Sequence, residues 1–298
     1  VQFFGDNLSA WTKTFAVFGI LAVIVFMITF TGTKERVAPA KETKQEKVPF
    51  LKGIGLLFKN KYWIMITVTL VFIFINYSLN GGAAVYYAKN ILHNENMVGT
   101  MNLVANLVQI GVMFFTAFLI KKIGKRNMLI IGAVVYGIGF AMFGFVGTNM
   151  AGIITACVLK GIGNAGISSC MFAIVSDTIE YGEWKTGKRI TGISFSGNLF
   201  FLKVGLAVAG AMVGFLLSWY GYDAGAKAQS ASALNGIVLL FSVIPGVGYL
   251  ITAGVVRLLK VDRTLMRQIQ SDLEKRRSNY SELNEYQELK TSEHVRKA

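Results

Sequence analysis

The sequence predicts an all-α membrane protein with about seven transmembrane helices. Of its 298 residues, 53% are hydrophobic and only 15% are charged, and the mean hydropathy is +0.52. Soluble domains of this length are rarely so apolar. The apolar residues are also gathered in long runs, and about 20 of them suffice for a helix to cross a bilayer. The seven runs cover about 10–31, 62–88, 98–120, 128–147, 150–174, 191–219 and 234–257.

The Lys and Arg residues between the runs predict how the helices are oriented in the cell (plasma or inner) membrane. Eight lie in 32–61, four in 121–126, three in 185–189 and ten after Val256, that is 25, against Lys13, Lys89 and Lys227 on the other side. Cytoplasmic segments are enriched in Lys and Arg, so we expect the amino end outside and the carboxyl end in the cytoplasm. The net charge of +14 then reflects topology, and no Arg-aromatic surface indicates a nucleic-acid partner.

The polar segments divide the chain into parts. A stretch rich in Pro and charge precedes the second run, and this composition is typical of a solvated linker. The chain opens on a valine and shows no signal peptide, so we expect it to be a piece of a longer protein. The predicted parts are the last helix of an amino-terminal bundle (1–31), a cytoplasmic inter-bundle linker (32–61), a six-helix bundle (62–258) and a cytoplasmic tail (259–298).

The stretch 176–189, SDTIEYGEWKTGKR, is the most specific part of the sequence. Its three acids and three bases cannot lie in hydrocarbon, which predicts a water-facing loop. Lys203 follows fourteen positions after Arg189, inside an apolar run. The D-T-x-E-Y-G-E-W pattern, the closing G-K-R and this spacing resemble the loop between helices ten and eleven of the glycoside-pentoside-hexuronide:cation symporters, the melibiose-permease branch of the major facilitator superfamily. KKIGKRN (121–127) resembles, more weakly, the superfamily's short cytoplasmic loop, with Lys121 in place of the usual aspartate.

The resemblance implies a major-facilitator-type helical bundle in which the seven runs match helices 6–12 of 12. It implies sugar (glycoside, pentoside or hexuronide):cation symport by alternating access, with a small sugar, the bilayer and the missing amino-terminal helices as partners. No cofactor is implied beyond a coupling cation (H⁺, Na⁺ or Li⁺), which the missing half would bind. The charged stretch would form a cytoplasmic gate from Asp177, Glu180, Tyr181, Gly182, Glu183, Lys185, Lys188 and Arg189.

Polar side chains form stripes on four of the predicted helices, because residues spaced i, i+4, i+7 share a helix face. Such stripes are typical of a wet central cavity whose amides, hydroxyls and tyrosines bind a sugar. Hydrogen bonds between helices are the alternative for each amide. The candidate substrate and coupling residues from these stripes are Asn76, Tyr77, Asn80, Asn102, Asn106, Gln109, Asn164 and Ser196.

Two lysines, Lys160 and Lys203, lie deep within the runs, where a lysine costs about 2.5–3.5 kcal/mol. No Asp or Glu lies deep in any run, so we expect their partners to come from elsewhere: carboxylates of the missing half, a substrate carboxylate or a bound anion. The resemblance implies that Lys203 neighbours the cation-site acids. Lys160 would tune substrate choice, for example by pairing with a hexuronate.

Other motifs indicate packing rather than chemistry. GIGNAG (161–166) fits G-x-G-x-x-G but lies in an apolar run without a preceding strand, so we interpret it as close helix packing. His93 and His294 are isolated, which gives no metal site, and no catalytic cluster indicates an enzyme. A seven-helix receptor or photoreceptor with a buried lysine remains the alternative function.

Overall fold

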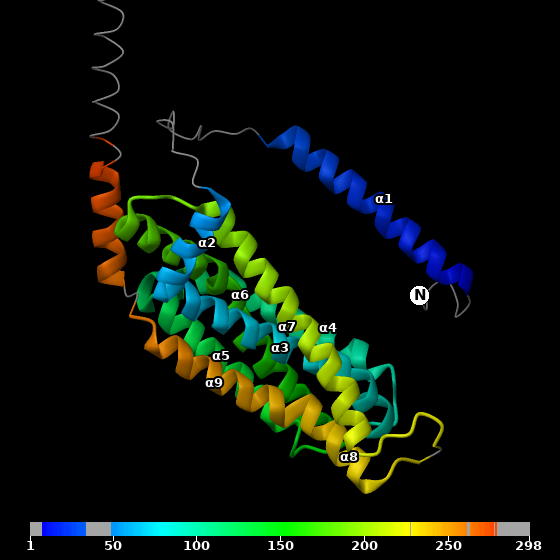
Figure 1. The fold of residues 1–298 in the computed structure, drawn as a ribbon. Coiled ribbons are helices and arrows are strands. Elements are labelled where there is room, and N and C mark those ends of the chain that lie inside the picture. Colours follow the sequence, from blue (N-terminus) through cyan, green and yellow to red (C-terminus); the bar gives the residue numbers. More distant parts are fainter. Residues whose placement is uncertain (1–7, 34–48, 227, 261–262, 277, 279–298) are drawn as a thin grey trace, which may run out of the picture. The chain divides into compact units, whose positions relative to one another are not determined.

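The computed structural model describes residues 8–33, 49–226, 228–260, 263–276 and 278, and every regular element among them is helical (Figure 1). The chain divides into two units, Val1–Lys47 and Val48–Ala298. The first contains α1 (Leu8–Gly32). The second contains α2 (Phe50–Lys59), α3 (Lys61–Asn90), α4 (Met97–Ile123), α5 (Lys125–Met142), α6 (Met150–Thr186), α7 (Thr191–Trp219), α8 (Ala231–Val238), the π-helix η2 (Leu239–Val243), α9 (Ile244–Leu258) and a helix of residues 263–276.

Within the described residues, six helical segments are long and apolar enough to cross a membrane: α1 from Ser9, α3, α4, α6, α7 and the continuous helix Ala231–Leu258. The remaining predicted run, 128–147, corresponds to α5, which has 18 residues and begins with Lys125 and Arg126. The predicted all-α membrane fold is therefore confirmed.

In the first unit, α1 is a single 25-residue helix whose side chains are apolar on all sides. Phe18 and Phe30 are 65% and 81% exposed. A helix that is apolar all round is typical of a membrane span.

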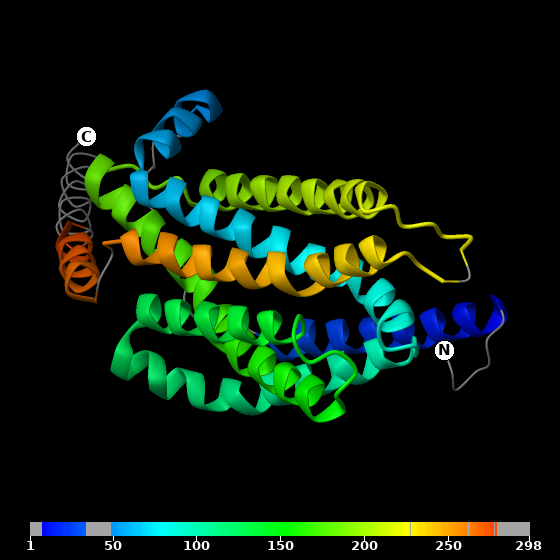
Figure 2. The same ribbon diagram turned by 90° about the horizontal axis from the view of Figure 1, so that it is seen from below.

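In the second unit, α3 packs between α7 and α9, while α6 packs between α4 and α5, and α5 also contacts α9 (Figure 2). Glycines let α6 approach its neighbours. A Cβ at Gly161 would lie 2.5 Å from the Ala105 carbonyl oxygen of α4, and one at Gly163 would overlap the Tyr136 backbone of α5. Such contacts need helices without side chains at the crossing, so the packing interpretation of GIGNAG is confirmed.

Residues 176–186 of the charged stretch are helical and not a loop, which corrects the sequence prediction. Helix α6 continues to Thr186 over 37 residues, because Ile179 and Tyr181 are buried against the bundle and favour further helical turns. Gly187 ends the helix in the left-handed conformation, with φ of 68° and its N–H donating to the Glu183 carbonyl.

The predicted linker and tail both contain packed helix. Residues 50–59 form α2, in which Gly53 and Leu57 are buried, so this part of the predicted linker is helical; residues 34–48 lie outside the described ranges. In the tail, the helix of residues 263–276 buries Met266, Ile269 and Leu273 in the core of the second unit. Their i, i+3, i+7 spacing places one apolar stripe against the bundle.

Candidate functional site

Lys160 lies in the core of the second unit, with 7% of its surface exposed. Its Nζ is 3.3 Å from Asn80 Oδ1 on α3. It also lies over the Phe140 ring at 4.3 Å from the centroid, and within 5.6 Å of the ring centroids of Phe143 and Phe241. The quadrupoles of aromatic faces attract a cation. Lys160 therefore has an amide oxygen and aromatic faces as partners within the chain, while the expected anionic partner stays a prediction.

Asn80 and Asn76 of α3 are tied into the same core. Asn80 donates from Nδ2 to the Phe241 carbonyl of η2 at 3.0 Å, so one amide connects three elements. The carbonyls of a π-helix are displaced from the regular α-helical ladder, and such turns are frequent at functional sites. Asn76 is buried, donates to the Phe72 carbonyl of its own helix, and sits where Gly248 of α9 leaves room for its amide.

A polar cluster joins α4 and α6. Asn164 Nδ2 donates to Gln109 Oε1 at 2.8 Å, Gln109 Nε2 lies 3.4 Å from Ser168 Oγ, and Ser168 Oγ lies 3.3 Å from Asn164 Oδ1. These three half-buried side chains satisfy one another, as interhelical hydrogen bonds do in membranes. For Gln109 and Asn164 the structure thus matches the alternative interpretation, in which the amides form hydrogen bonds between helices.

The other predicted substrate residues are exposed on what we call the open faces of α3, α4 and α7. Lys203 and Ser196 are exposed on α7, and no described residue pairs with the Lys203 ammonium. A Cβ at Gly210, two turns further along α7, would meet no atom within 4 Å. The remaining members of the open faces are Tyr77 of α3 and Asn102 and Asn106 of α4.

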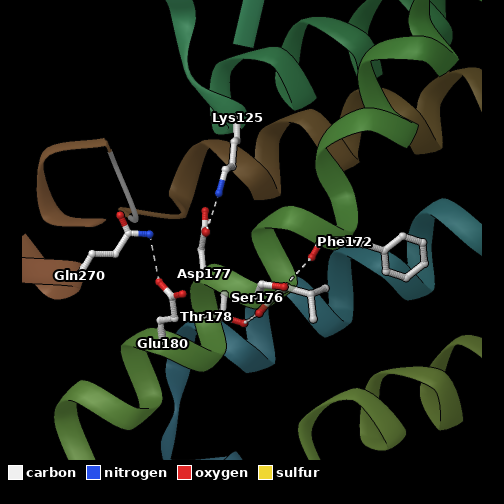
Figure 3. A network of polar contacts seen from close by, with 8 residues as sticks. Lys125, Phe172, Ser176, Asp177, Thr178, Glu180 and Gln270 are labelled. Atoms are coloured by element: carbon white, nitrogen blue, oxygen red, sulfur yellow. Dashed lines mark hydrogen bonds and ion pairs between the residues drawn. The ribbon is translucent and has the colours of Figure 1, made fainter. Parts of the chain in front are cut away.

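The charged end of α6 is joined to its neighbours by polar contacts (Figure 3). Lys125 Nζ of α5 lies 2.7 Å from Asp177 Oδ1. Gln270 Nε2, from the helix of residues 263–276, lies 3.3 Å from Glu180 Oε2. The two acids point to different elements (Figure 3), so this turn of α6 connects α5 with the tail helix.

The remaining predicted gate residues follow along the same helix end. Arg189 Nη1 lies 3.6 Å from Glu183 Oε2, Tyr181 packs edge-on against Tyr62 of α3 at 4.6 Å between centroids, and Gly182 lies against the Asn60 side chain. Lys185 is exposed and Lys188 half-buried. Each described acid of the stretch thus has a partner within the second unit.

Sequence reasoning missed two residues at this end. Asn60 accepts from the Trp63 N–H, which caps α3, and donates to the Thr178 carbonyl of α6 at 2.8 Å. Asp272 accepts from Trp184 Nε1 at 2.9 Å. Asn60 could have been found from its position just before the apolar run, where asparagine is favoured as an N-cap. Nothing in the sequence signals the partner of Asp272.

This arrangement offers polar groups that can recognise a ligand. Across the described ranges, no group of three or more His, Cys, Asp or Glu side chains is placed to hold a metal ion. The predicted substrate and coupling residues carry amides, one hydroxyl, one tyrosine phenol and two ammonium groups, which suit a hydroxylated small molecule.

Comparisons with known proteins agree with the fold. Residues 3–263 match the family described as MFS/sugar transport protein. The chain is 28% identical over 289 residues to the isoprimeverose transporter of Lactiplantibacillus pentosus, covering 95% of this chain and 59% of that protein. It is 33% identical over 245 residues to the inner membrane symporter YicJ of Escherichia coli (strain K12), covering 80% and 51%, and 28% identical over 243 residues to that organism's putative sulfoquinovose importer, covering 81% and 51%.

The chain therefore spans a little more than half the length of these relatives. The match favours a transporter over the receptor or photoreceptor alternative and confirms the resemblance to the sugar symporters drawn from the charged stretch. The chain is a multi-pass membrane protein that belongs to the MFS/sugar transport protein family.

Proposed function

We propose that the chain contributes the carboxyl-terminal bundle of a secondary active transporter, which carries a small sugar or glycoside together with a cation by alternating access. The family match over residues 3–263 carries this proposal. In such transporters two helical bundles rock against each other around a site near the middle of the membrane. The helices that precede this bundle in the longer relatives supply the second bundle in our proposal.

The open faces are the proposed lining of the sugar pathway. Their polar side chains lie at membrane depth among exposed apolar ones such as Leu103 and Phe200, and polar groups at this depth are expensive unless they serve a function. Lys203 is the proposed coupling residue, because its ammonium is unpaired among the described residues. The carboxylates that bind the coupling cation would come from the other bundle, where the cation and Lys203 compete for the same acids.

The charged end of α6 is the proposed cytoplasmic gate, in an orientation with the carboxyl end of the chain in the cytoplasm. Its ion pairs with Lys125 and Arg189 hold Asp177 and Glu183 in fixed positions, with each base more exposed than its acid. Water screens pairs whose basic partner is exposed, so each contributes on the order of 1 kcal/mol. A gate built from several of them can open without a large barrier.

Transport by membrane vesicles tests the proposal. The chain, co-expressed with the five helices that precede it in the family arrangement, should accumulate isoprimeverose or sulfoquinovose when an inward H⁺ or Na⁺ gradient is imposed. Lys203→Ala should abolish accumulation without lowering the amount of protein in the membrane. The matched control is Lys89→Ala, which removes a lysine ion-paired to Glu95 outside the open faces and should leave uptake unchanged.

Two results would contradict the proposal. Gradient-driven uptake by the chain alone would show that no second bundle is needed. Accumulation by Lys203→Ala at the unmodified rate would show that the lysine has no part in coupling, while the transporter assignment itself would stand.

A further inference from the structure

We propose that the second unit binds a phosphate-bearing anion in a cavity between the α4–α5 turn, the charged end of α6 and the helix of residues 263–276. This inference is independent of the proposed sugar transport. The cavity has a volume of about 470 Å³. Its charged lining residues are Lys125, Arg126, Arg263, Arg267 and Asp177, so four bases face one acid and the described lining carries a formal charge of +3.

Two of these bases retain donors without a partner. Arg126 uses Nη2 to donate to the Arg257 carbonyl at 2.6 Å, but its Nε–H is buried without a hydrogen-bond partner. The Arg267 guanidinium makes no hydrogen bond or ion pair with any described residue. Since a buried N–H left unpaired costs free energy, the Nε–H of Arg126 indicates a ligand with acceptor oxygens. Guanidinium groups match the geometry of phosphate oxygens.

The amino end of α5 faces the same cavity. Residues 124–127 line it, and the first turn of this 18-residue helix has no acidic residue and no capping side chain. Its first backbone N–H groups therefore have no partner within the helix. Such groups, together with the positive end of the helix dipole, favour an anion.

The rest of the lining indicates what the anion is attached to. Ile120, Ile123, Ile174, Leu259 and Met266 also line it, and α4, which supplies the first two, is long and apolar enough to cross a membrane. A volume well above that of one phosphate ion, with both basic and apolar lining residues, suits a phosphodiester with a glycerol backbone. Basic pockets between membrane helices bind lipid headgroups in this way. A soluble phosphate offers the same oxygens to the same bases.

Binding measurements on the full chain in a neutral detergent test the proposal. The probes are dioctanoyl phosphatidylglycerol and inorganic phosphate, with dioctanoylglycerol as the lipid without phosphate, and isothermal titration gives the Kd. Arg267→Gln should weaken binding about tenfold or more, because it removes a charge-assisted contact. The matched control is Lys275→Gln, which removes the same charge from the same helix at a residue that does not line the cavity and should change the Kd less than twofold.

The probes distinguish the two sources of phosphate. Binding of the phospholipid alone identifies a headgroup site, whereas comparable binding of inorganic phosphate identifies a site for a soluble anion; both support the proposal if Arg267→Gln weakens them selectively. Failure of both phosphate probes to bind overturns it. So does equal weakening by Arg267→Gln and Lys275→Gln, or equal binding of dioctanoylglycerol, since either would indicate general charge attraction or detergent-like adsorption.

Discussion

The same residue types occur in the packed interior of the second unit and on its open faces, but they are packed against other residues in the interior and exposed on the open faces. Lys160 is enclosed by three aromatic rings and an amide, whereas Lys203 is exposed on α7. Gly163 meets the backbone of α5, whereas Gly210 meets no atom within 4 Å. Gln109 is hydrogen-bonded to α6, whereas Asn106 is exposed one turn away on the same helix.

The difference teaches that a polar or small residue in a membrane span has two separate uses. In the interior it joins helices, and its removal should cost stability. On an open face it contributes little to the fold of this unit and is free to contact a substrate or a second bundle. Paired substitutions separate the two uses, and the free energy of unfolding in detergent measures the first.

The largest expected difference in the free energy of unfolding is between two glycine variants. Gly163→Ala should lower the free energy of unfolding by about 2–3 kcal/mol, because the new Cβ overlaps the Tyr136 backbone and overpacking costs this much. Gly210→Ala should raise it by about 0.5–1 kcal/mol, because alanine stabilises an exposed helix position. Thermal unfolding followed by circular dichroism measures both. The same sign for the two variants would contradict the division into packed and open faces.

The lysines should show the next largest difference. Lys160→Ala should destabilise the chain by about 2 kcal/mol, since it removes the ring contacts and leaves Oδ1 of the half-buried Asn80 unpaired. Lys203→Ala should change the stability by less than about 0.5 kcal/mol, as is usual for exposed sites. Chemical unfolding in detergent measures both changes. If Lys160→Ala proved neutral, the aromatic enclosure would not hold the ammonium.

The smallest difference is expected at the amides of α4. Gln109→Leu should destabilise the chain by about 1 kcal/mol, because the half-buried hydrogen bond from Asn164 is lost and interhelical bonds in membranes are worth roughly this much. Asn106→Leu on the open face should change the stability by less than half of that. The double variant Gln109→Leu with Asn164→Leu sharpens the comparison: if the two effects add, the amides do not act on each other.

Much of the fold could be predicted from the sequence because apolar length is a local property. Runs long enough to cross a bilayer must become helices there, since every backbone group has to be bonded within the segment. The close helix packing at GIGNAG could also be predicted, because this motif of small residues lies within an apolar run. Sequence reasoning failed at 176–186, where the charges indicated a loop. The helix continues there because Ile179 and Tyr181 find a buried surface, and such a surface is not visible in the charged stretch itself.

The sequence by itself determined the helical membrane class, the spans and the set of polar residues within them, because composition and periodicity act along the chain. Only the tertiary structure decided which of those residues are satisfied, because that depends on partners far away in sequence. Lys160 finds Asn80 across 80 residues, and Trp184 finds Asp272 across 88. The cavity that is lined by both Arg126 and Arg267 likewise forms only when the helix of residues 263–276 contacts α6 and the end of α4.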